Sequence, residues 1–129
     1  MKTQVFKHRF TVEDYHRMTE VGILGPDDRV ELIDGEIVRE SPVKSPHAAH
    51  VDRLTSLLVP RAARRFLVRI QSSVQLDRYS EPRPDVSLLR YRSDFYVERH
   101  PSPPDVLAGR PRHPDRGGSL IRGRDFTHH

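Results

Sequence analysis

The stretch EPRPDVSLL, residues 81–89, decides how this chain folds. Pro84 has no amide hydrogen and biases the residue before it toward extended geometry, so it suits the first position of a β-strand. The residues that follow alternate, with Asp85 on one face and Val86 on the other. We therefore predict a strand that begins at Asp85 and holds this carboxylate at its start, near solvent or a cation.

The segment before this strand has the clearest alternation in the chain. Between residues 67 and 77, one face is apolar (Val68, Ile70, Val74, Leu76) and the other is polar after Leu67 (Arg69, Gln71, Ser73, Gln75, Asp77). With a turn over residues 77–82, the two strands pair antiparallel. We expect their polar faces to form one side of a cleft.

A helix and a hairpin are predicted near the amino terminus. Thr11 is a suitable N-cap with Asp14 at the third helical position, and Gly22 can end the helix in left-handed geometry. Asp34-Gly35 is the pair favoured in a type I′ turn, which would join residues 30–33 to residues 36–39 in a ribbon at the edge of a sheet.

A second helix is predicted from Ser45, with Ser45 as N-cap and Pro46 at the first helical position. Pro60 should stop or kink it. Its apolar residues recur at helical spacing, which indicates a buried stripe made of Ala48, Val51, Leu54, Thr55 and Leu58.

Composition indicates one domain of 129 residues, with 35% hydrophobic and 31% charged residues. The absence of cysteine excludes disulfides and thiolate metal sites. No run is apolar enough for a signal peptide or a membrane span, so we expect a cytoplasmic protein without a membrane partner.

The formal net charge of +4 belongs mostly to the last part of the chain, where residues 108–129 hold five arginines and two aspartates. Val106-Leu107 resembles the start of a strand, but AGRPRHPDRGG follows it, rich in Arg, Gly and Pro with little to bury. We predict a folded domain over residues 1–107 and a disordered tail over residues 108–129.

Five side chains are candidates for metal chemistry. Asp85 is the best ligand for Mg²⁺, which prefers carboxylate oxygens, although it can equally be a polar residue that caps a turn. Glu31 and Glu36 share a ribbon face and could add a carboxylate, or they could be solvated charges at a sheet edge. His47 and His50 have a spacing compatible with zinc, or they could simply flank the helix.

The order of these motifs resembles that of a known family. TVEDY (11–15), RVELIDGEI (29–37), SPH (45–47), the strand at residues 68–76 and EPRPDV (81–86) are similar to the putative restriction endonuclease family of the PD-(D/E)XK nuclease superfamily. The resemblance runs from about Phe10 to Leu107.

The resemblance implies an α+β fold with a restriction-endonuclease-like αβββαβ core, incomplete at the carboxyl end and preceded by a helix and a β-hairpin. It implies a DNA endonuclease that uses Mg²⁺, with Asp85 as the first metal ligand, and homodimers as a possible assembly. Glu31 is not part of what the resemblance implies and remains a candidate because of its place on the ribbon. In such proteins the strand that starts with Asp-Val-Leu continues to a glutamate and a lysine.

The sequence departs from this pattern after Leu107, where neither residue follows, and all three lysines (Lys2, Lys7, Lys44) precede Asp85. The catalytic set is therefore incomplete. We hypothesise that the chain after about Leu107 is translated out of frame relative to a complete family member. Two alternatives are a non-catalytic remnant that binds nucleic acid through its arginine-rich tail, and a gene fragment without function.

Overall fold

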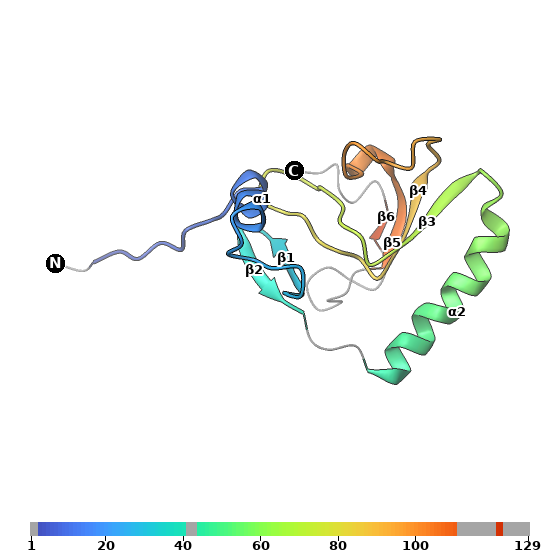
Figure 1. Cartoon of the computed structure of the whole chain (residues 1–129), viewed down its shortest axis with the longest axis horizontal. Helices are drawn as coiled ribbons and strands as arrows, with labels where there is room; N and C mark the ends of the chain where they lie inside the picture. Colours follow the sequence, from blue (N-terminus) through green and yellow to red (C-terminus); the bar gives the residue numbers. More distant parts are fainter. Residues whose placement is uncertain (1–2, 41–43, 111–120, 123–129) are drawn as a thin grey trace.

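The computed structural model describes residues 3–40, 44–110 and 121–122 (Figure 1). These residues form a mixed α+β fold with two α-helices and two small antiparallel sheets. The helices are α1 (Val12–Glu20), α2 (Ser45–Ala62) and the short 3₁₀ helix η1 (Pro103–Asp105), and the strands are β1 (Val30–Ile33), β2 (Glu36–Arg39), β3 (Phe66–Ile70), β4 (Val86–Arg90), β5 (Val106–Arg110) and β6 (Ile121–Arg122). Within the described ranges no helix has the length and apolarity needed to cross a membrane.

Helix α1 starts as predicted. The amide of Asp14 donates to Thr11 Oγ1 at 3.1 Å and the amide of Thr11 donates to Asp14 Oδ2 at 2.9 Å, which is a complete capping box. After the helix, Gly22 has a φ of +83°, the left-handed geometry expected of it.

The hairpin of β1 and β2 has the predicted register, with Ile33 opposite Glu36 and Leu32 opposite Ile37. Asp34 and Gly35 both have positive φ, +48° and +80°, as a type I′ turn requires. Helix α1 packs on this hairpin, and together they bury a small core of Val12, Tyr15, Val30 and Leu32, with Phe10, Leu24 and Ile37 against it.

Gly35 is a position where a side chain meets two obstacles. Its φ of +80° disfavours other residues, and an ideal Cβ would lie 2.6 Å from Cβ of Arg9. We expect Gly35→Ala to lower the free energy of unfolding by about 1–3 kcal/mol, measured by urea denaturation. Gly22→Ala is the matched control, because Gly22 has a φ of +83° with nothing within 4 Å of an added Cβ. If both variants lose the same free energy of unfolding, the contact between the added Cβ and Arg9 does not contribute to the destabilisation.

Helix α2 differs from the prediction at both ends. Its N-cap is Lys44, which makes no side-chain capping bond, so Ser45 lies inside the helix and is not the cap. The helix also continues through Pro60 to Ala62 and ends at Ala63, whose φ is +40°. The predicted stripe is confirmed, since Val51 is buried and Ala48, Leu54, Thr55 and Leu58 are half-buried.

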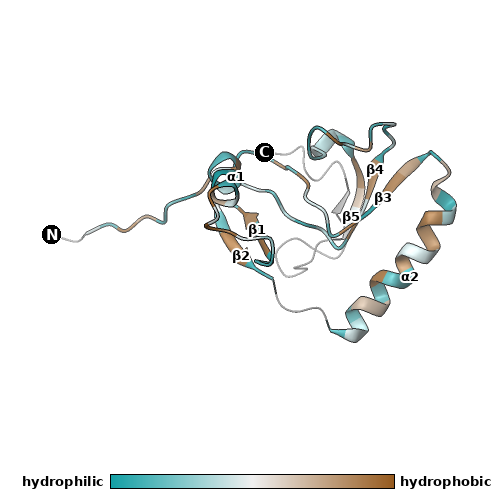
Figure 2. Cartoon of the chain, in the orientation of Figure 1, coloured by the Kyte–Doolittle hydropathy of each residue, from teal (hydrophilic) through white to brown (hydrophobic). Residues whose placement is uncertain are grey.

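The four-stranded sheet has the order β3-β4-β5-β6, and α2 contacts β3 and β4. Figure 1 shows α2 beside this sheet, away from α1 and the hairpin. The hydropathy colours of Figure 2 show α2 as alternately teal and brown, and β3, β4 and β5 as largely brown. The second core lies at this sheet and consists of Val74, Leu89, Tyr96 and Val106, with Leu67 and Leu76 against it.

Strand β3 is shorter than predicted. It pairs antiparallel with β4, as expected, but it ends at Ile70 because Gln71 has a φ of +50° and turns the chain out of the sheet. The prediction of a single strand over residues 67–77 is therefore wrong. The predicted apolar face is also wrong within β3. Leu67, predicted on the opposite face, packs on the core with Val74, whereas Ile70, predicted on the apolar face, is exposed.

Strand β5 continues past Leu107, where the sequence was expected to lose its strand character. It extends to Arg110 and pairs with β4 on one side and β6 on the other. The register shifts between Leu88 and Leu89, so Leu107 has no partner residue on β4. Leu107 is 45% exposed. The rest of the predicted disordered tail, residues 111–120 and 123–129, lies outside the described residues.

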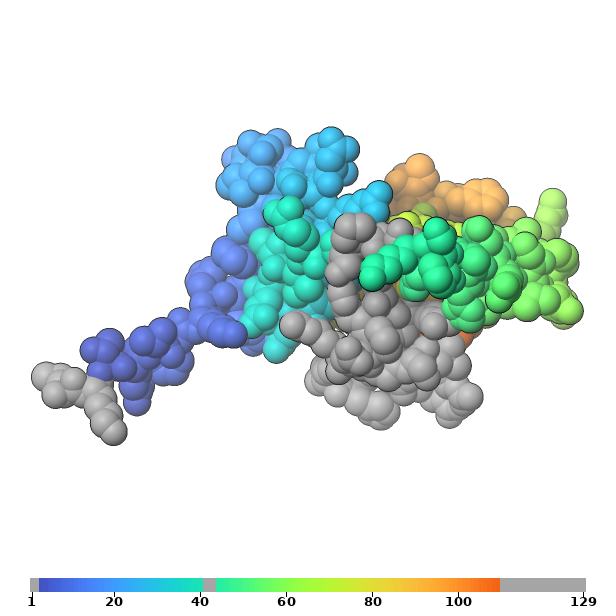
Figure 3. Space-filling view, turned by 90° about the horizontal axis from the view of Figure 1, so that it is seen from below, coloured from blue at the N-terminus to red at the C-terminus, as the bar shows by residue number. Residues whose placement is uncertain are grey.

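The described chain before Thr11 forms an arm. Figure 3 shows it as a narrow run of atoms that extends from the hairpin. Val5 and Phe6 on this arm are 88% and 81% exposed. Lys7 and Arg9 connect the arm to the hairpin through ion pairs with Glu36 and Asp34.

Candidate functional site

Asp85 lies immediately before β4 and is fully buried, with 0% of its surface exposed. Its carbonyl accepts a hydrogen bond from the amide of Gln71 at 3.0 Å, which fixes it at the end of β3. Of the two surroundings expected for this carboxylate, solvent or a cation, its burial excludes solvent, while the cation stays a prediction. Ser87 and Leu89, which share its face of the strand, are also buried, at 1% and 0% exposure.

The first turn of α2 supplies a partner for Asp85. His47 Nε2 is 2.9 Å from Asp85 Oδ2, and the pair is ionic when the imidazole is protonated. His47 is therefore turned toward the candidate metal ligand. His50 lies half-buried on the same side of α2. Neither belongs to the one group of three ligand side chains that the described residues contain.

Glu31 has a different place from Glu36, although the two share a ribbon face. Glu31 is 1% exposed, and its Oε2 accepts a hydrogen bond from the amide of Arg83 at 2.8 Å. Glu36 is exposed and pairs with Lys7 at 3.2 Å. The interpretation as a solvated edge charge fits Glu36 and is wrong for Glu31, which holds the backbone two residues before Asp85.

Strand β5, which pairs with β4, brings no carboxylate to the end of the sheet where Asp85 lies. In the observed register Ser87 lies opposite Gly109 and Val86 lies opposite Arg110. Of the described lysines, Lys7 is paired with Glu36 and Lys44 is exposed at the start of α2. Mg²⁺ prefers oxygen ligands in octahedral geometry, and one of the atoms next to the Asp85 carboxylate is the imidazole nitrogen of His47. These residues do not fit a complete Mg²⁺ centre.

A cleft of about 930 Å³ opens between α1 and the segments around the four-stranded sheet. The predicted polar face lines it, through Arg69, Gln71, Ser73 and Gln75. This confirms the expectation that these side chains form one side of a cleft. The polar face of the strand at Asp85, which was expected to share that side, does not line this cleft. The opposite wall comes from α1 and from residues 97–100.

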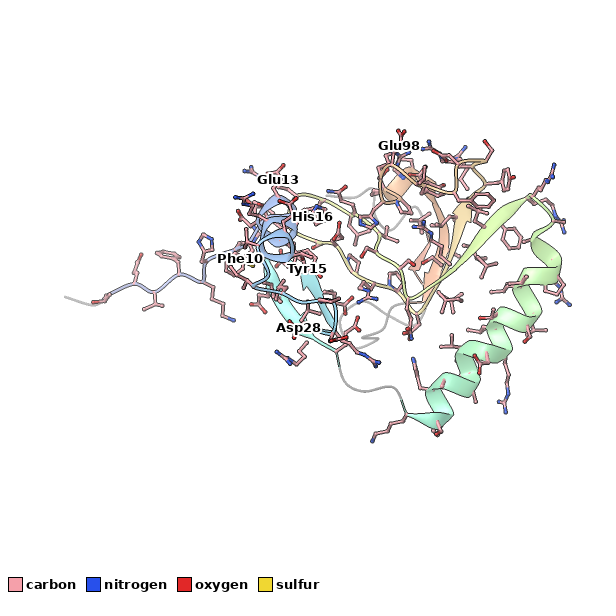
Figure 4. All side chains as sticks on the ribbon, in the orientation of Figure 1. Phe10, Glu13, Tyr15, His16, Asp28 and Glu98 are labelled. Atoms are coloured by element: carbon pink, nitrogen blue, oxygen red, sulfur yellow. The ribbon has the colours of Figure 1, made fainter. Side chains whose placement is uncertain are left out.

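Two histidines and a glutamate meet in this cleft. His16 Nε2 lies 2.8 Å from Glu81 Oε1 and 3.0 Å from Oε2, and His100 completes a group whose ligand atoms all lie within 4.8 Å of one another. Figure 4 shows His16 and Tyr15 on the side of α1 that faces the rest of the fold. Sequence reasoning missed this group, because its members are far apart in the chain and, although Glu81 belongs to the EPRPDV motif, no motif links it to His16 and His100.

Tyr15 lies next to this group and remains a hydrogen-bond donor. Burial, together with the nearby carboxylates of which Glu81 is the first, raises the pKa of Tyr15. Its hydroxyl donates to the carbonyl of Val30 at 3.2 Å. The bond joins α1 to β1 beneath the cleft wall.

Asp105 holds together the loop that carries His100. Its Oδ2 accepts hydrogen bonds from Arg99 Nη1 at 2.9 Å, from the amide of Ser102 at 3.0 Å and from the hydroxyl of Ser102 at 3.2 Å. Burial raises the pKa of Asp105, but the bonds from Arg99 and Ser102 outweigh it, so the pKa lies below its usual value. The ionised carboxylate therefore stabilises the fold.

We expect Asp105→Asn to lower the free energy of unfolding at pH 7 by about 1–2 kcal/mol. Because the folded pKa is lowered, the contribution of Asp105 is present above the ordinary value of 3.8 and is lost as the pH falls through the folded pKa. The difference between the variant and the wild type should shrink in acid. Urea unfolding at several pH values measures it, with exposed Asp27→Asn as control, and a difference that does not depend on pH would contradict it.

The fold and site define an α+β domain with a buried aspartate where a Pro-Asp sequence enters the central strand. The model of the Uma2 family, described as putative restriction endonuclease, matches residues 12–108. The match covers most of the chain, so the chain belongs to this family, as its motifs predicted. Neither the curated proteins nor the solved structures include a match.

Proposed function

We propose that this chain derives from a Mg²⁺-dependent DNA endonuclease of the PD-(D/E)XK type, and that its own catalytic set is incomplete. Family membership supports the descent. The order α2, β3, β4, β5 supports it as well, because these elements would be the first helix and the three strands of the αβββαβ core. In this proposal the chain is a domain that resembles a nuclease and does not cleave DNA efficiently.

The observation that carries the proposal is the position of Asp85. A carboxylate with no exposed surface at the start of a central strand is uncommon, because burial of a charge is costly without a partner. A metal ligand is one reason to keep such a residue. Here His47 approaches the same carboxylate to 2.9 Å and can stabilise it without a metal ion.

Glu31 is proposed to position Asp85. Its carboxylate accepts from the amide of Arg83, and the Arg83 guanidinium donates to the carbonyl of Gln71 at 3.2 Å. The amide of Gln71 donates in turn to the carbonyl of Asp85. This chain of hydrogen bonds links the hairpin to the candidate site, so Glu31 acts through the backbone.

The surface of α2 is proposed to contact DNA. Four exposed arginines lie on α2 and in the turn that follows it, at positions 53, 61, 64 and 65. Guanidinium groups pair with backbone phosphates without regard to sequence. Binding through them would weaken as the salt concentration rises.

A plasmid nicking assay with the full chain tests the proposal. With Mg²⁺ or Mn²⁺, we expect no more nicked plasmid than Asp85→Ala produces under the same conditions. Cleavage by the wild type that disappears in Asp85→Ala would show that the catalytic set is sufficient. The out-of-frame hypothesis has its own test in the coding DNA after Leu107. If no other frame encodes an apolar strand with a glutamate and a later lysine, that hypothesis is wrong.

A further inference from the structure

The cleft holds a second set of ligand side chains, separate from Asp85. His16 comes from α1, Glu81 from the segment before β4, and His100 from the loop before η1. All three line the cleft. In the described part of the chain this is the only group of three histidine or acidic residues close enough to hold one ion.

The backbone fixes two of the three ligands from both sides of the cleft. The amide of Glu81 donates to the carbonyl of Leu32 at 2.8 Å, which ties Glu81 to β1. Next to His100, the buried Pro101 accepts from the amide of Gln75 at 2.8 Å. His16 lies inside the capped helix α1. The arrangement is therefore set by the fold rather than by flexible side chains alone.

Glu81 is the buried member of the group. It is 2% exposed, while the side chain of His16 is 43% exposed and His100 is exposed. A carboxylate removed from water needs positive charge or hydrogen bonds nearby, and two imidazoles with a metal ion supply both. Exposed imidazoles in turn leave a path for the ion from solvent.

We propose that His16, Glu81 and His100 bind a divalent transition-metal ion, with Zn²⁺ as the natural occupant. Two imidazole nitrogens and one carboxylate oxygen are a donor set that zinc uses in sites that keep a fourth position open. Nitrogen ligands favour Zn²⁺ over Mg²⁺ or Ca²⁺. The fourth position would be reached from the cleft.

The geometry requires only a small adjustment to admit the ion. Tetrahedral zinc with ligands at about 2.0–2.1 Å separates its donor atoms by about 3.3 Å. His16 and Glu81 are now 2.8–3.0 Å apart, so their atoms must move apart by a few tenths of an ångström. The ligand atom of the third residue, His100, lies within 4.8 Å of the other two, close enough for a small side-chain movement to bring it to the ion.

The site is independent of the proposed nuclease chemistry. Asp85 is not among the residues that line this cleft, and it pairs with His47 from α2. The proposal that His16, Glu81 and His100 bind zinc therefore does not depend on the endonuclease proposal. Its tests use metal affinity and thermal stability, which do not depend on DNA cleavage.

Titration of the metal-free full chain with Zn²⁺ by calorimetry tests the proposal. We expect one equivalent bound, a rise in Tm with Zn²⁺, and an affinity at least tenfold lower in His100→Ala. His100 is exposed, so this variant should keep its fold, and circular dichroism checks that. Glu81→Gln should show the same loss, provided that it folds.

Two control variants test three of the six other histidines. His50→Ala and the double variant His128→Ala/His129→Ala should bind Zn²⁺ with unchanged affinity. The proposal is overturned if the wild type binds no Zn²⁺, if His100→Ala binds as tightly as the wild type, or if a control variant loses the binding instead. Co²⁺ in place of Zn²⁺ gives an absorption spectrum that reports the coordination, and a spectrum unchanged by His100→Ala would also overturn it.

Discussion

Leu89→Ala should lower the free energy of unfolding by about 2–5 kcal/mol, which is a large part of the stability of a domain this small. Leu89 is 0% exposed at the centre of the core of the four-stranded sheet, against Val74, Tyr96 and Val106. Its loss removes buried apolar contacts from β4, the strand that follows Asp85. Urea denaturation followed by circular dichroism measures the effect.

The control for this variant is Leu107→Ala in the neighbouring strand β5. Leu107 is 45% exposed, so its truncation should change the free energy of unfolding by no more than about 0.5 kcal/mol. A similar loss in both variants would mean that the core at Leu89 is not the main source of stability in this sheet.

Gly109→Glu should give a larger response to Mg²⁺ than the wild type shows. Gly109 lies opposite Ser87, and Asp85 shares the face of Ser87, so a glutamate at position 109 would lie diagonally across from Asp85. An added Cβ would make only an ordinary contact, 3.7 Å from the carbonyl of Val86. Two nearby carboxylates repel each other unless a cation lies between them.

The expected result is a variant that is less stable than the wild type in EDTA and gains stability when Mg²⁺ is added. The gain would reach about 2.7 kcal/mol when free Mg²⁺ is a hundred times its Kd. Thermal unfolding with and without Mg²⁺ measures it. Gly109→Gln has the same size without the charge and should show no gain. An equal Mg²⁺ response in both variants would contradict the assignment of Asp85 to the remains of a metal site.

Local signals in the sequence predicted local structure well. The capping box of Thr11 and Asp14, the turn at Asp34-Gly35 and the stripe of α2 depend on residues a few positions apart, and the structure confirms all three. The Pro-Asp sequence likewise predicted the start of a strand to within one residue, since β4 begins at Val86, directly after Asp85. These features need no knowledge of the rest of the fold.

Features that depend on distant contacts were not predictable in the same way. The alternation at residues 67–77 indicated a single strand, but the positive φ of Gln71, whose carbonyl accepts a hydrogen bond from Arg83, ends it at Ile70. The alternation predicted on which face of the strand Asp85 lies, but it could not show that His47 of α2 would contact its carboxylate. The group of His16, Glu81 and His100 joins residues from α1 and two loops, and no spacing in the sequence marks it.

The segment of residues 78–81 joins the two small cores, and this has a consequence for how the domain opens. Its backbone exchanges hydrogen bonds with the first core at three places: Val12 donates to Arg78, Gly35 donates to Tyr79, and Glu81 donates to Leu32. Each of these amide hydrogens is held in a bond between the segment and α1 or the hairpin, so its exchange with solvent requires that bond to open. The three amides should therefore behave as one cooperative unit in native-state hydrogen exchange, and a ligand that bridges the cleft would slow all three together.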